Sequence, residues 1–329
     1  MTAQTNIWTG RRTLGDGEVS ALGFGCWTIG GPFTDNEGRP IGWGEVDDGE
    51  SIRAVRRAVD LGVTFFDTAD VYGAGHSEEV LGRALAGRRD AVVIASKWGN
   101  VFDPDRKVMT GDDSSPAYLR RALEGTLRRL GTDYLDLYQL HIAPSIEDTA
   151  VLAGACEELV REGLIRGYGL STDDPERAEV FAAGAHCVSV QHELSVLHDM
   201  PSLLAMCERH DLASIDHAPL AMGLLARATT WKPAGSADIR SVPQAWMRFF
   251  DGGVPTAEWA ARVGAVRDIL TSDGRTLAQG ALAWVWARSP RTIPIPGFRT
   301  VAQAEENAGA LEHGPLRAEQ LAEIAAALA

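Results

Sequence analysis

The sequence contains little cysteine and no paired cysteine motif. Its 329 residues include four cysteines, and none of them has the Cys-x-x-Cys spacing that is typical of zinc sites and redox centres. A chain of this length can bury a large hydrophobic core, so it needs neither disulfides nor a structural metal for stability. We therefore expect structural thiols and no metal site.

Long apolar runs and basic stretches are also missing. No segment approaches the ~18 consecutive apolar residues of a membrane-spanning helix, and the first ten residues, MTAQTNIWTG, lack the apolar core of a signal peptide. The formal net charge is −14, and no basic stripe of the kind that binds nucleic-acid phosphates is visible. These absences predict a cytoplasmic protein that binds neither membranes nor nucleic acid.

What the sequence does contain is a regular alternation of short apolar runs and stretches with helical period. The helical pattern is clearest over 116–130, where Leu119, Leu123 and Leu127 share one face and Gly131 follows the last turn. Eight strands are predicted, over Leu22–Gly25, Val63–Phe66, Ala91–Ser96, Tyr134–Leu140, Ile165–Gly169, Cys187–Val190, Ala213–Asp216 and Thr292–Ile295. Eight strand–helix units with short connections predict a parallel sheet, either closed into a barrel or doubly wound.

A missing glycine motif favours the barrel. A doubly wound dinucleotide-binding domain normally carries Gly-x-Gly-x-x-Gly after its first strand, and this sequence does not. With the count of eight, this predicts an α/β fold with a single (β/α)8 TIM-barrel domain over residues 1–329. The segment 12–20, with Asp16-Gly17 inside it, is typical of a β-hairpin, which we expect to plug the bottom of the barrel.

Three connections are long and follow predicted strands one, three and seven: 30–49, 99–115 and 225–255. Long loops in compact domains are usually functional, and in a (β/α)8 barrel the loops that follow strands lie on the catalytic face. We expect these loops to shape a substrate pocket.

Five apolar runs in succession end in a polar or ionisable residue, namely Asp67, Lys97, His141, Ser171 and Gln191. Chemistry in this fold takes place at the carboxyl ends of strands, so five such ends indicate a site. Taken singly, Asp67 has an ordinary explanation as a turn cap, His141 as a core histidine and Lys97 as a solvent-reaching side chain. Tyr72 lies five residues after Asp67, in the loop that follows.

An Asp, a Tyr, a Lys and a His together suit the addition of hydride to a carbonyl. The alkoxide that forms needs a proton donor at its oxygen, and a tyrosine hydroxyl with its ordinary pKa of ~10 is a weak one. A neighbouring lysine ammonium stabilises the developing tyrosinate, and an aspartate keeps that lysine charged. A histidine at the same oxygen can orient or polarise the carbonyl.

Four motifs resemble those of the aldo-keto reductase family, in the family's order and over essentially the whole chain. They are FDTADVYG at 66–73 with SEEVLG at 77–82, IASK at 94–97, YLDLYQLH at 134–141, and IPG at 295–297 with EEN at 305–307. The resemblance implies reduction of an aldehyde or ketone by NADPH (or NADH), with Tyr72 as general acid supported by Asp67, Lys97 and His141. The implied partner is a small-molecule carbonyl substrate, and both a monomer and a homo-oligomer remain possible.

The resemblance also implies a cofactor bound in extended form. Ser171 and Gln191 would hold its carboxamide, with Thr172 beside them where the family usually has Asn. His217 stands where a Tyr commonly stacks on the nicotinamide. Arg299 is the candidate for the 2′-phosphate, because a guanidinium can donate two hydrogen bonds to it. The other implied cofactor residues are Gly25, Cys26, Trp27, Asp67, Pro219, Leu220, Gly223, Leu225, Gly297, Gln303, Glu306 and Asn307.

Aromatic residues are expected to form much of the substrate pocket. The predicted pocket consists of Trp27, Trp43, Tyr72, Trp98 and His141, with Trp231, Trp246, Phe249 and Phe250 as further candidates. They favour a ring-bearing or otherwise sizeable carbonyl compound, or a sugar-like one stacked on an aromatic face.

Two other functions were weighed against a reductase. Some barrels of this family, such as the potassium-channel β subunits, act mainly through partners, so a cofactor-binding regulatory or redox-sensing subunit with little turnover is the alternative. The intact Asp, Tyr, Lys and His set argues against it. A metal-dependent hydrolase barrel would need clustered ligands such as His-x-His at a strand end, and the sequence has none.

Overall fold

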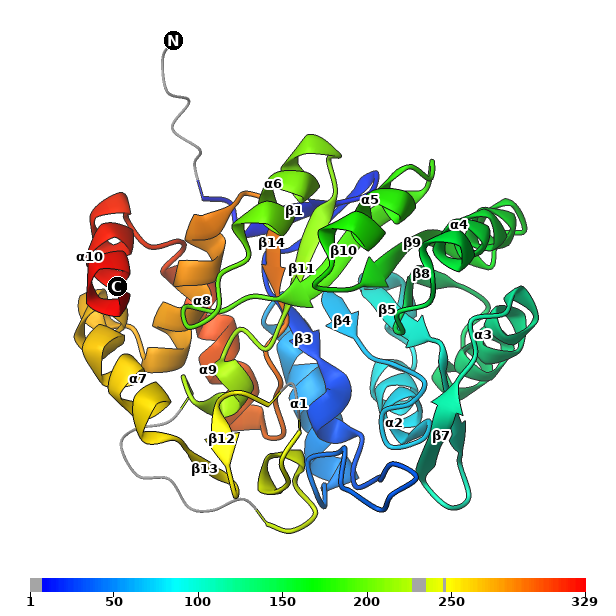
Figure 1. Ribbon diagram of the computed structural model, residues 1–329, viewed down its shortest axis with the longest axis horizontal. Coiled ribbons are helices and arrows are strands. Elements are labelled where there is room, and N and C mark those ends of the chain that lie inside the picture. Colours follow the sequence, from blue (N-terminus) through cyan, green and yellow to red (C-terminus); the bar gives the residue numbers. More distant parts are fainter. Residues whose placement is uncertain (1–7, 227–234, 245–246) are drawn as a thin grey trace.

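The computed structural model describes residues 8–226, 235–244 and 247–329 (Figure 1). Eight parallel strands form the central sheet in the order β14-β11-β10-β9-β8-β5-β4-β3. A parallel bridge between Gly25 and Gly297 joins the two edge strands, and the Gly25 N–H donates to the carbonyl of Pro296 at 3.1 Å. The sheet is thus nearly closed as a barrel surrounded by helices, and the predicted (β/α)8 fold is confirmed.

All eight predicted strands form, with ends displaced by up to three residues. They are β3 (Gly23–Gly25), β4 (Phe65–Asp67), β5 (Val93–Trp98), β8 (Leu135–Leu140), β9 (Ile165–Ser171), β10 (Cys187–Glu193), β11 (Ala213–His217) and β14 (Thr292–Pro294). The shorter strands outside the barrel are β1 (Arg11–Leu14), β2 (Gly17–Ser20), β6 (Asn100–Asp103), β7 (Val108–Asp112), β12 (Phe250–Asp251) and β13 (Val254–Pro255).

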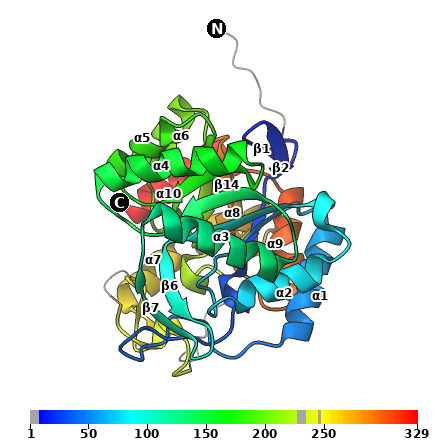
Figure 2. The ribbon, with the colours of Figure 1, turned by 90° about the vertical axis from the view of Figure 1, so that its right-hand side faces the viewer.

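Helices cover the outside of the barrel (Figures 1 and 2). They are α1 (Asp48–Asp60), α2 (His76–Leu85), α3 (Pro116–Leu130), α4 (Ile146–Arg161), α5 (Pro175–Ala182), α6 (Pro201–Arg209), α7 (Ala257–Leu270), α8 (Leu277–Arg288), α9 (Val301–Gly309) and α10 (Ala318–Leu328). The 3₁₀ helices are η1 (Cys26–Ile29), η2 (Arg89–Ala91), η3 (Ala221–Gly223), η4 (Ile239–Ser241), η5 (Ser272–Gly274) and η6 (Ala310–Glu312). No helix in the described ranges combines the length and apolarity that crossing a membrane requires.

Helix α3 shows how local sequence fixes an element. Its bounds are those predicted, because Ser115 accepts a hydrogen bond from the backbone N–H three residues later and Gly131 ends the helix in the left-handed conformation, with φ of 67°. Leu119 and Leu123 are buried against the barrel, whereas Leu127 is only partly buried.

Alternate strand residues face the barrel interior, as the two-residue period of a strand requires. The interior is filled by Phe65, Ala95, Leu137, Ala213, Ile215, Ile293 and Ile295. Two residues further along three of these strands come Asp67, Lys97 and Gln139, so their side chains point to the same side, above the apolar filling. Their immediate neighbours in sequence point outward, toward the helices.

The hairpin β1–β2 closes the amino-terminal end of the barrel, as predicted. Leu14 pairs with Gly17, so the turn consists of Gly15 and Asp16, and the predicted turn at Asp16-Gly17 is one residue off. Gly15 takes the turn's left-handed conformation with φ of 57°. Val19 is 1% exposed and belongs to the apolar cluster of the barrel interior.

The three long loops lie at the opposite end of the barrel (Figure 2). The loop after β5 contains the hairpin β6–β7, which the sequence analysis missed, and the loop after β11 contains η4 and the pair β12–β13. Bridges from Thr34 to Val108 and from Trp43 to Asp238 tie the loop after β3 to the other two. Together the loops form one rim around the carboxyl ends of the strands.

Candidate active site

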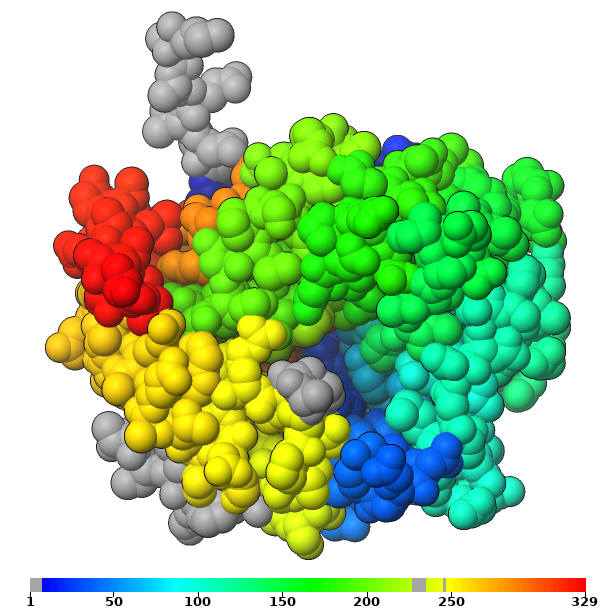
Figure 3. All heavy atoms as spheres, viewed as in Figure 1, coloured from blue at the N-terminus to red at the C-terminus, as the bar shows by residue number. Residues whose placement is uncertain are grey.

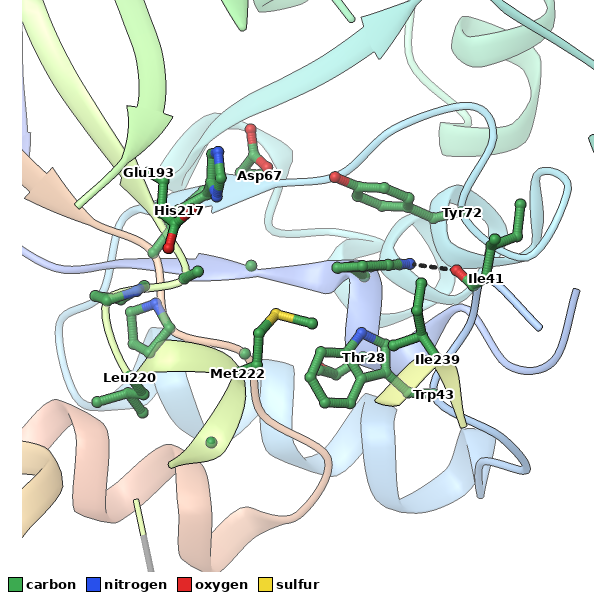
Figure 4. Close-up of a pocket in the computed structure, with 18 of the residues that line it drawn as sticks. Thr28, Ile41, Trp43, Asp67, Tyr72, Glu193, His217, Leu220, Met222 and Ile239 are labelled. Atoms are coloured by element: carbon green, nitrogen blue, oxygen red, sulfur yellow. Dashed lines mark hydrogen bonds between the residues drawn. The ribbon is translucent and has the colours of Figure 1, made fainter. Parts of the chain in front are cut away.

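A cavity of about 510 Å³ lies at the carboxyl ends of the strands, inside this rim. The molecular surface is hollowed near the centre of the view in Figure 3, between the yellow and blue segments. In Figure 4, Tyr72 and Asp67 lie along one side of the cavity, and Met222, Trp43 and Ile239 face them from the other. In the described ranges, no group of three or more His, Cys, Asp or Glu side chains is placed to hold a metal ion.

A buried lysine contacts two of the residues that line the cavity, Asp67 and Tyr72. Lys97, at the end of β5, is fully buried and makes an ion pair with Asp67 at the end of β4. Its Nζ also donates to the carbonyl of Thr68 at 2.9 Å and to the hydroxyl of Tyr72 at 3.3 Å. Burial works to lower the pKa of Lys97, but the charge of Asp67 and the interaction with Tyr72 outweigh it and leave that pKa raised. The ammonium group is therefore charged at neutral pH.

Two glutamines hold the second carboxylate oxygen of Asp67. Gln139 donates to Oδ2 at 3.0 Å from β8, and Gln191 donates to the same oxygen at 2.8 Å from β10. The sequence analysis did not single out Gln139. The signal was present, because Gln139 follows the interior residue Leu137 by two positions. The orientation of Asp67 is thus fixed from both sides.

The Tyr72 ring is packed between two other rings. It stacks on Trp27, with centroids 5.8 Å apart and planes at 23°, and meets His141 edge-on at 5.7 Å. Burial raises the pKa of Tyr72, although the charge of Lys97 works to lower it. The hydroxyl is therefore protonated at neutral pH and lies within hydrogen-bonding reach of the ammonium.

Two glycines place the Tyr72 loop against the loop after β3. A Cβ added to Gly73, whose φ is 63°, would overlap the carbonyl oxygen of Gly30. A Cβ added to Gly30 would lie 3.0 Å from the carbonyl carbon of Tyr72. The two backbones touch directly, and only glycine permits this approach.

His141 is a neutral imidazole in this site. Its pKa is well below the ordinary value, first because of burial and then because the Lys97 ammonium and the neighbouring His217 disfavour a positive charge on the ring. Its Nδ1 lies 3.3 Å from the side-chain nitrogen of Asn100, at the start of β6. The sequence analysis did not name Asn100, because it lies in a loop without a periodic pattern.

Most of the predicted cofactor residues line this cavity. They are Gly25, Trp27, Asp67, Ser171, Gln191, His217, Pro219, Leu220, Gly223, Gly297, Arg299 and Gln303. Arg299 donates to the backbone carbonyls of Trp43, at 3.1 Å, and of Glu45. Gln303 accepts from the backbone N–H of Arg299 at 2.7 Å.

Four predicted side chains point away from the cavity, which corrects the sequence analysis. Trp98 is fully buried and packs beside Tyr138, with centroids 6.3 Å apart, because it follows the inward-pointing Lys97 and must face outward. Cys26, in η1, and Leu225 are fully buried in the core cluster that includes the helix-facing side of the sheet. Of the predicted pair of phenylalanines, Phe249 lines the cavity, whereas Phe250 is buried in that core.

Thr172, Glu306 and Asn307 are not among the residues that line the cavity. The Thr172 hydroxyl accepts from the backbone N–H of Asp174 at 3.1 Å, and Asn307 donates to the carbonyl of Gly297 at 3.4 Å. Trp231 and Trp246 lie outside the described residues.

Several lining residues were not predicted. Arg240 pairs with Asp238 through two hydrogen bonds, of 2.9 and 2.7 Å, and its guanidinium lies 4.9 Å from the Trp43 ring centroid. No periodic pattern in the loop after β11 could have placed it. Glu193 also lines the cavity, two residues beyond Gln191, where strand alternation would have placed it. The apolar lining adds Phe33, Ile41, Val71, Met109, Met222, Ile239 and Met247.

Comparison with known proteins agrees with this site. The sequence profile described as the aldo/keto reductase family matches residues 21–329. The chain belongs to the aldo/keto reductase family. It is therefore an oxidoreductase.

Individual members of the aldo/keto reductase family support the assignment over most of the chain. "Aldo-keto reductase yakc [NADP(+)]" from Schizosaccharomyces pombe is 31% identical over 92% of this chain and 86% of that protein. The holo form of aldo-keto reductase AKR11C1 from Bacillus halodurans is 29% identical, with a TM-score of 0.77 and coverage of 97% of both chains. An aldo/keto reductase from Klebsiella pneumoniae, solved in complex with NADP and acetate, is 29% identical, with a TM-score of 0.71 over 96% of this chain and 94% of that one.

Proposed function

We propose that this aldo-keto reductase transfers hydride from NADPH to an aldehyde or ketone, with Tyr72 as the general acid. One observation carries the proposal: the buried Lys97 ammonium contacts both the Asp67 carboxylate and the Tyr72 hydroxyl, and these two partners line the cavity. A charged, buried lysine at this distance stabilises the tyrosinate that proton donation would leave behind.

The cavity residues fit a nicotinamide cofactor. The Gln191 amide nitrogen donates to Asp67, so its Oε1 is left to accept a hydrogen bond from the carboxamide of the cofactor. The Ser171 hydroxyl, which also lines the cavity, can donate a hydrogen bond to the same carboxamide. The imidazole of His217 offers a flat face on the same wall. Arg299 lines the cavity and suits the 2′-phosphate that distinguishes NADPH from NADH, because a planar guanidinium can donate two hydrogen bonds to a phosphate.

The comparisons support NADPH as this cofactor. The name of the S. pombe relative includes NADP(+), and the K. pneumoniae structure contains NADP. When bound, such a cofactor supplies a hydride to the carbonyl carbon.

Residues of the chain then supply the proton that the carbonyl oxygen takes up. Tyr72 gives its hydroxyl proton to the carbonyl oxygen, and Lys97 stabilises the resulting phenolate until the hydroxyl is restored. Asp67 holds Lys97 charged and oriented, while His141, whose ring meets the Tyr72 ring edge-on, can polarise the oxygen. The stacked Trp27 excludes water from one face of the tyrosine ring.

The substrate that fits best is a neutral, ring-bearing carbonyl compound. Beside Tyr72 the wall consists of Trp27, Trp43, Phe33, Ile41 and Met109. The charged residues that line the cavity are Asp67, Glu193, Arg240 and Arg299, and each of them is held in an ion pair or by carbonyl groups. Apolar aromatic walls favour an uncharged ring over a carboxylate or a free sugar.

Titration of the purified protein with NADPH and with NADH tests the proposal, because Trp27 and Trp43 line the cavity and their fluorescence reports binding. A panel of benzaldehyde, 4-carboxybenzaldehyde, hexanal and glyceraldehyde, followed by the absorbance of reduced nicotinamide, then tests turnover. We expect tighter NADPH binding and the highest kcat/KM for benzaldehyde. Failure to bind either cofactor would overturn the proposal, and binding without any turnover would favour the regulatory alternative.

A further inference from the structure

A side chain from a loop fixes one nitrogen of the His141 ring. The Nδ2 of Asn100 lies 3.3 Å from Nδ1 of His141, and both residues line the cavity. Asn100 is itself held in place, because its carbonyl accepts a 2.5 Å hydrogen bond from the Tyr118 hydroxyl of α3 and its backbone pairs with Asp112 of β7. The contact therefore belongs to the fold and not to a freely moving side chain.

The protonation state of His141 makes this contact decisive. The groups that face the imidazole are the Tyr72 ring from the loop after β4, Lys97 from β5 and His217 from β11. Lys97 and His217 disfavour a second proton on the ring, and so does burial, so the ring is neutral. A neutral imidazole has one nitrogen that donates and one that accepts, and the partner of one nitrogen selects the role of the other.

We propose that Asn100 is a positioning residue that holds His141 in the tautomer with its proton on Nε2. An amide N–H of Asn100 donates to Nδ1, so Nδ1 carries the lone pair and Nε2, the nitrogen left for a ligand, carries the proton. This proposal rests on the proposed function, in which a carbonyl oxygen meets His141 and Tyr72.

The tautomer matters because the carbonyl oxygen gains negative charge as hydride arrives at the carbon. An Nε2–H donates a hydrogen bond to that oxygen, while an Nε2 lone pair would repel it. The loss of one preorganised donor to a developing oxyanion reduces kcat on the order of 10²-fold. The proton transferred to the oxygen still comes from Tyr72, so His141 gives up no proton in this step.

The Asn100→Asp variant reverses the preference at Nδ1. An ionised carboxylate only accepts, so it would place the proton of a neutral ring on Nδ1 and turn Nε2 into an acceptor. The same carboxylate also raises the pKa of His141. At low pH the doubly protonated ring would again present an Nε2–H, so activity is expected to recover there.

Two measurements test this inference. The first is kcat as a function of pH. At low pH, we expect the kcat of Asn100→Asp to be close to that of the wild type. As pH rises, we expect the kcat of this variant to fall on the order of 10²-fold. Asn100→Ala, which merely releases the ring, should lose activity by a smaller factor with no new ionisation. NADPH dissociation constants should stay close to wild type in both variants. A general structural defect would not produce recovery at one end of the pH range.

The second measurement does not depend on turnover. In protein labelled with ¹⁵N-histidine, the nitrogen shifts of His141, assigned by their loss in His141→Asn, report which nitrogen is protonated. We expect a protonated Nε2 in the wild type and a protonated Nδ1 in Asn100→Asp above the ring pKa. A wild-type Nδ1–H, or a tautomer and pH profile unchanged in Asn100→Asp, would overturn the inference. If no carbonyl is reduced, the proposed function fails while the nitrogen shifts still decide the tautomer.

Discussion

Gln191 donates a 2.8 Å hydrogen bond from Nε2 to Oδ2 of Asp67, across the barrel from β10 to β4. One side chain thereby connects the wall proposed to hold the carboxamide with the carboxylate that orients Lys97. The bond also fixes which end of the Gln191 amide faces the cavity. The proposed cofactor site and the proposed proton-donating site are therefore built on the same few hydrogen bonds.

Replacing Tyr72 by Phe removes the proposed proton donor and leaves the ring packing on Trp27 and His141 in place. We expect carbonyl reduction to fall by roughly 10²–10⁴-fold, the range that general acid catalysis contributes, with NADPH binding nearly unchanged. Stopped-flow turnover and fluorescence titration measure the two quantities. Tyr134→Phe is the matched control, because it removes the same hydroxyl from a ring outside the cavity lining. The Tyr134 ring lies between the guanidiniums of Arg89 and Arg166, at 4.2 and 4.3 Å. Near-normal turnover in Tyr72→Phe would refute the assigned role.

Arg299→Ala should weaken NADPH binding by roughly 10-fold or more, because a charge-assisted hydrogen bond to phosphate contributes about 1.5–3 kcal/mol. NADH lacks this phosphate and should be affected less. Titrations of both cofactors at one ionic strength measure the ratio. Arg161→Ala, whose side chain is 71% exposed, controls for the lost charge. Equal weakening of both cofactors would mean that Arg299 acts by holding the backbone at Trp43 and Glu45.

Trp98→Phe tests the corrected position of this tryptophan. Because Trp98 is buried on the outer face of β5 and its Nε1 has no hydrogen-bond partner in the structure, the change leaves a void without breaking a hydrogen bond. The free energy of unfolding should fall by roughly 0.5–3 kcal/mol, and KM for benzaldehyde should stay constant. Trp27→Leu, on the cavity wall, should instead raise that KM. A KM effect of similar size in Trp98→Phe would contradict the placement.

The stability of Glu193→Gln relative to the wild type should increase as pH rises. Burial raises the pKa of Glu193 to about 7, against the opposing charge of Arg248. An unfolded glutamate titrates near ~4.3, so between these values the folded state binds more protons and the wild type loses stability as pH increases. Glutamine does not titrate, and we expect its advantage to grow by on the order of 1–3 kcal/mol from pH ~5 to ~8.

Urea unfolding at several pH values measures this difference for Glu193→Gln. The exposed Glu124, changed to Gln, serves as the control. Arg248 donates to Glu193 Oε2 at 3.2 Å, so the lost ion pair subtracts from the gain. If the stability difference between Glu193→Gln and the wild type does not change with pH, the pKa of Glu193 is not raised in the folded state.

Strand periodicity made the barrel predictable from the sequence, together with most strand-end residues of the site. Asp67, Lys97 and His141 are found by where the apolar runs end. The same periodicity would have corrected the error at Trp98, since a residue next to an inward-facing Lys97 must face outward. It would also have found Gln139, which continues the inward series of β8.

The loop residues of the site could not be predicted in this way. Arg240 and Asn100 reach the cavity because separate loops are paired with each other or with α3, as in the bridge from Trp43 to Asp238 and the Tyr118 bond to Asn100. Such pairings join distant segments and leave no periodic trace in either one. Cys26 was misplaced for a related reason, since a 3₁₀ turn begins immediately after β3.

The contact between Gly30 and Gly73 has a practical meaning for redesign of this enzyme. Any side chain at Gly73 would collide with the neighbouring backbone and shift the segment that carries Tyr72, so neither glycine belongs in a randomised library. Phe33, Ile41 and Met109 of the cavity wall come from stretches beyond this joint. Chimaeras that take only segments 32–47 and 101–112 from another family member should therefore change substrate preference while Tyr72 and its partners stay in place.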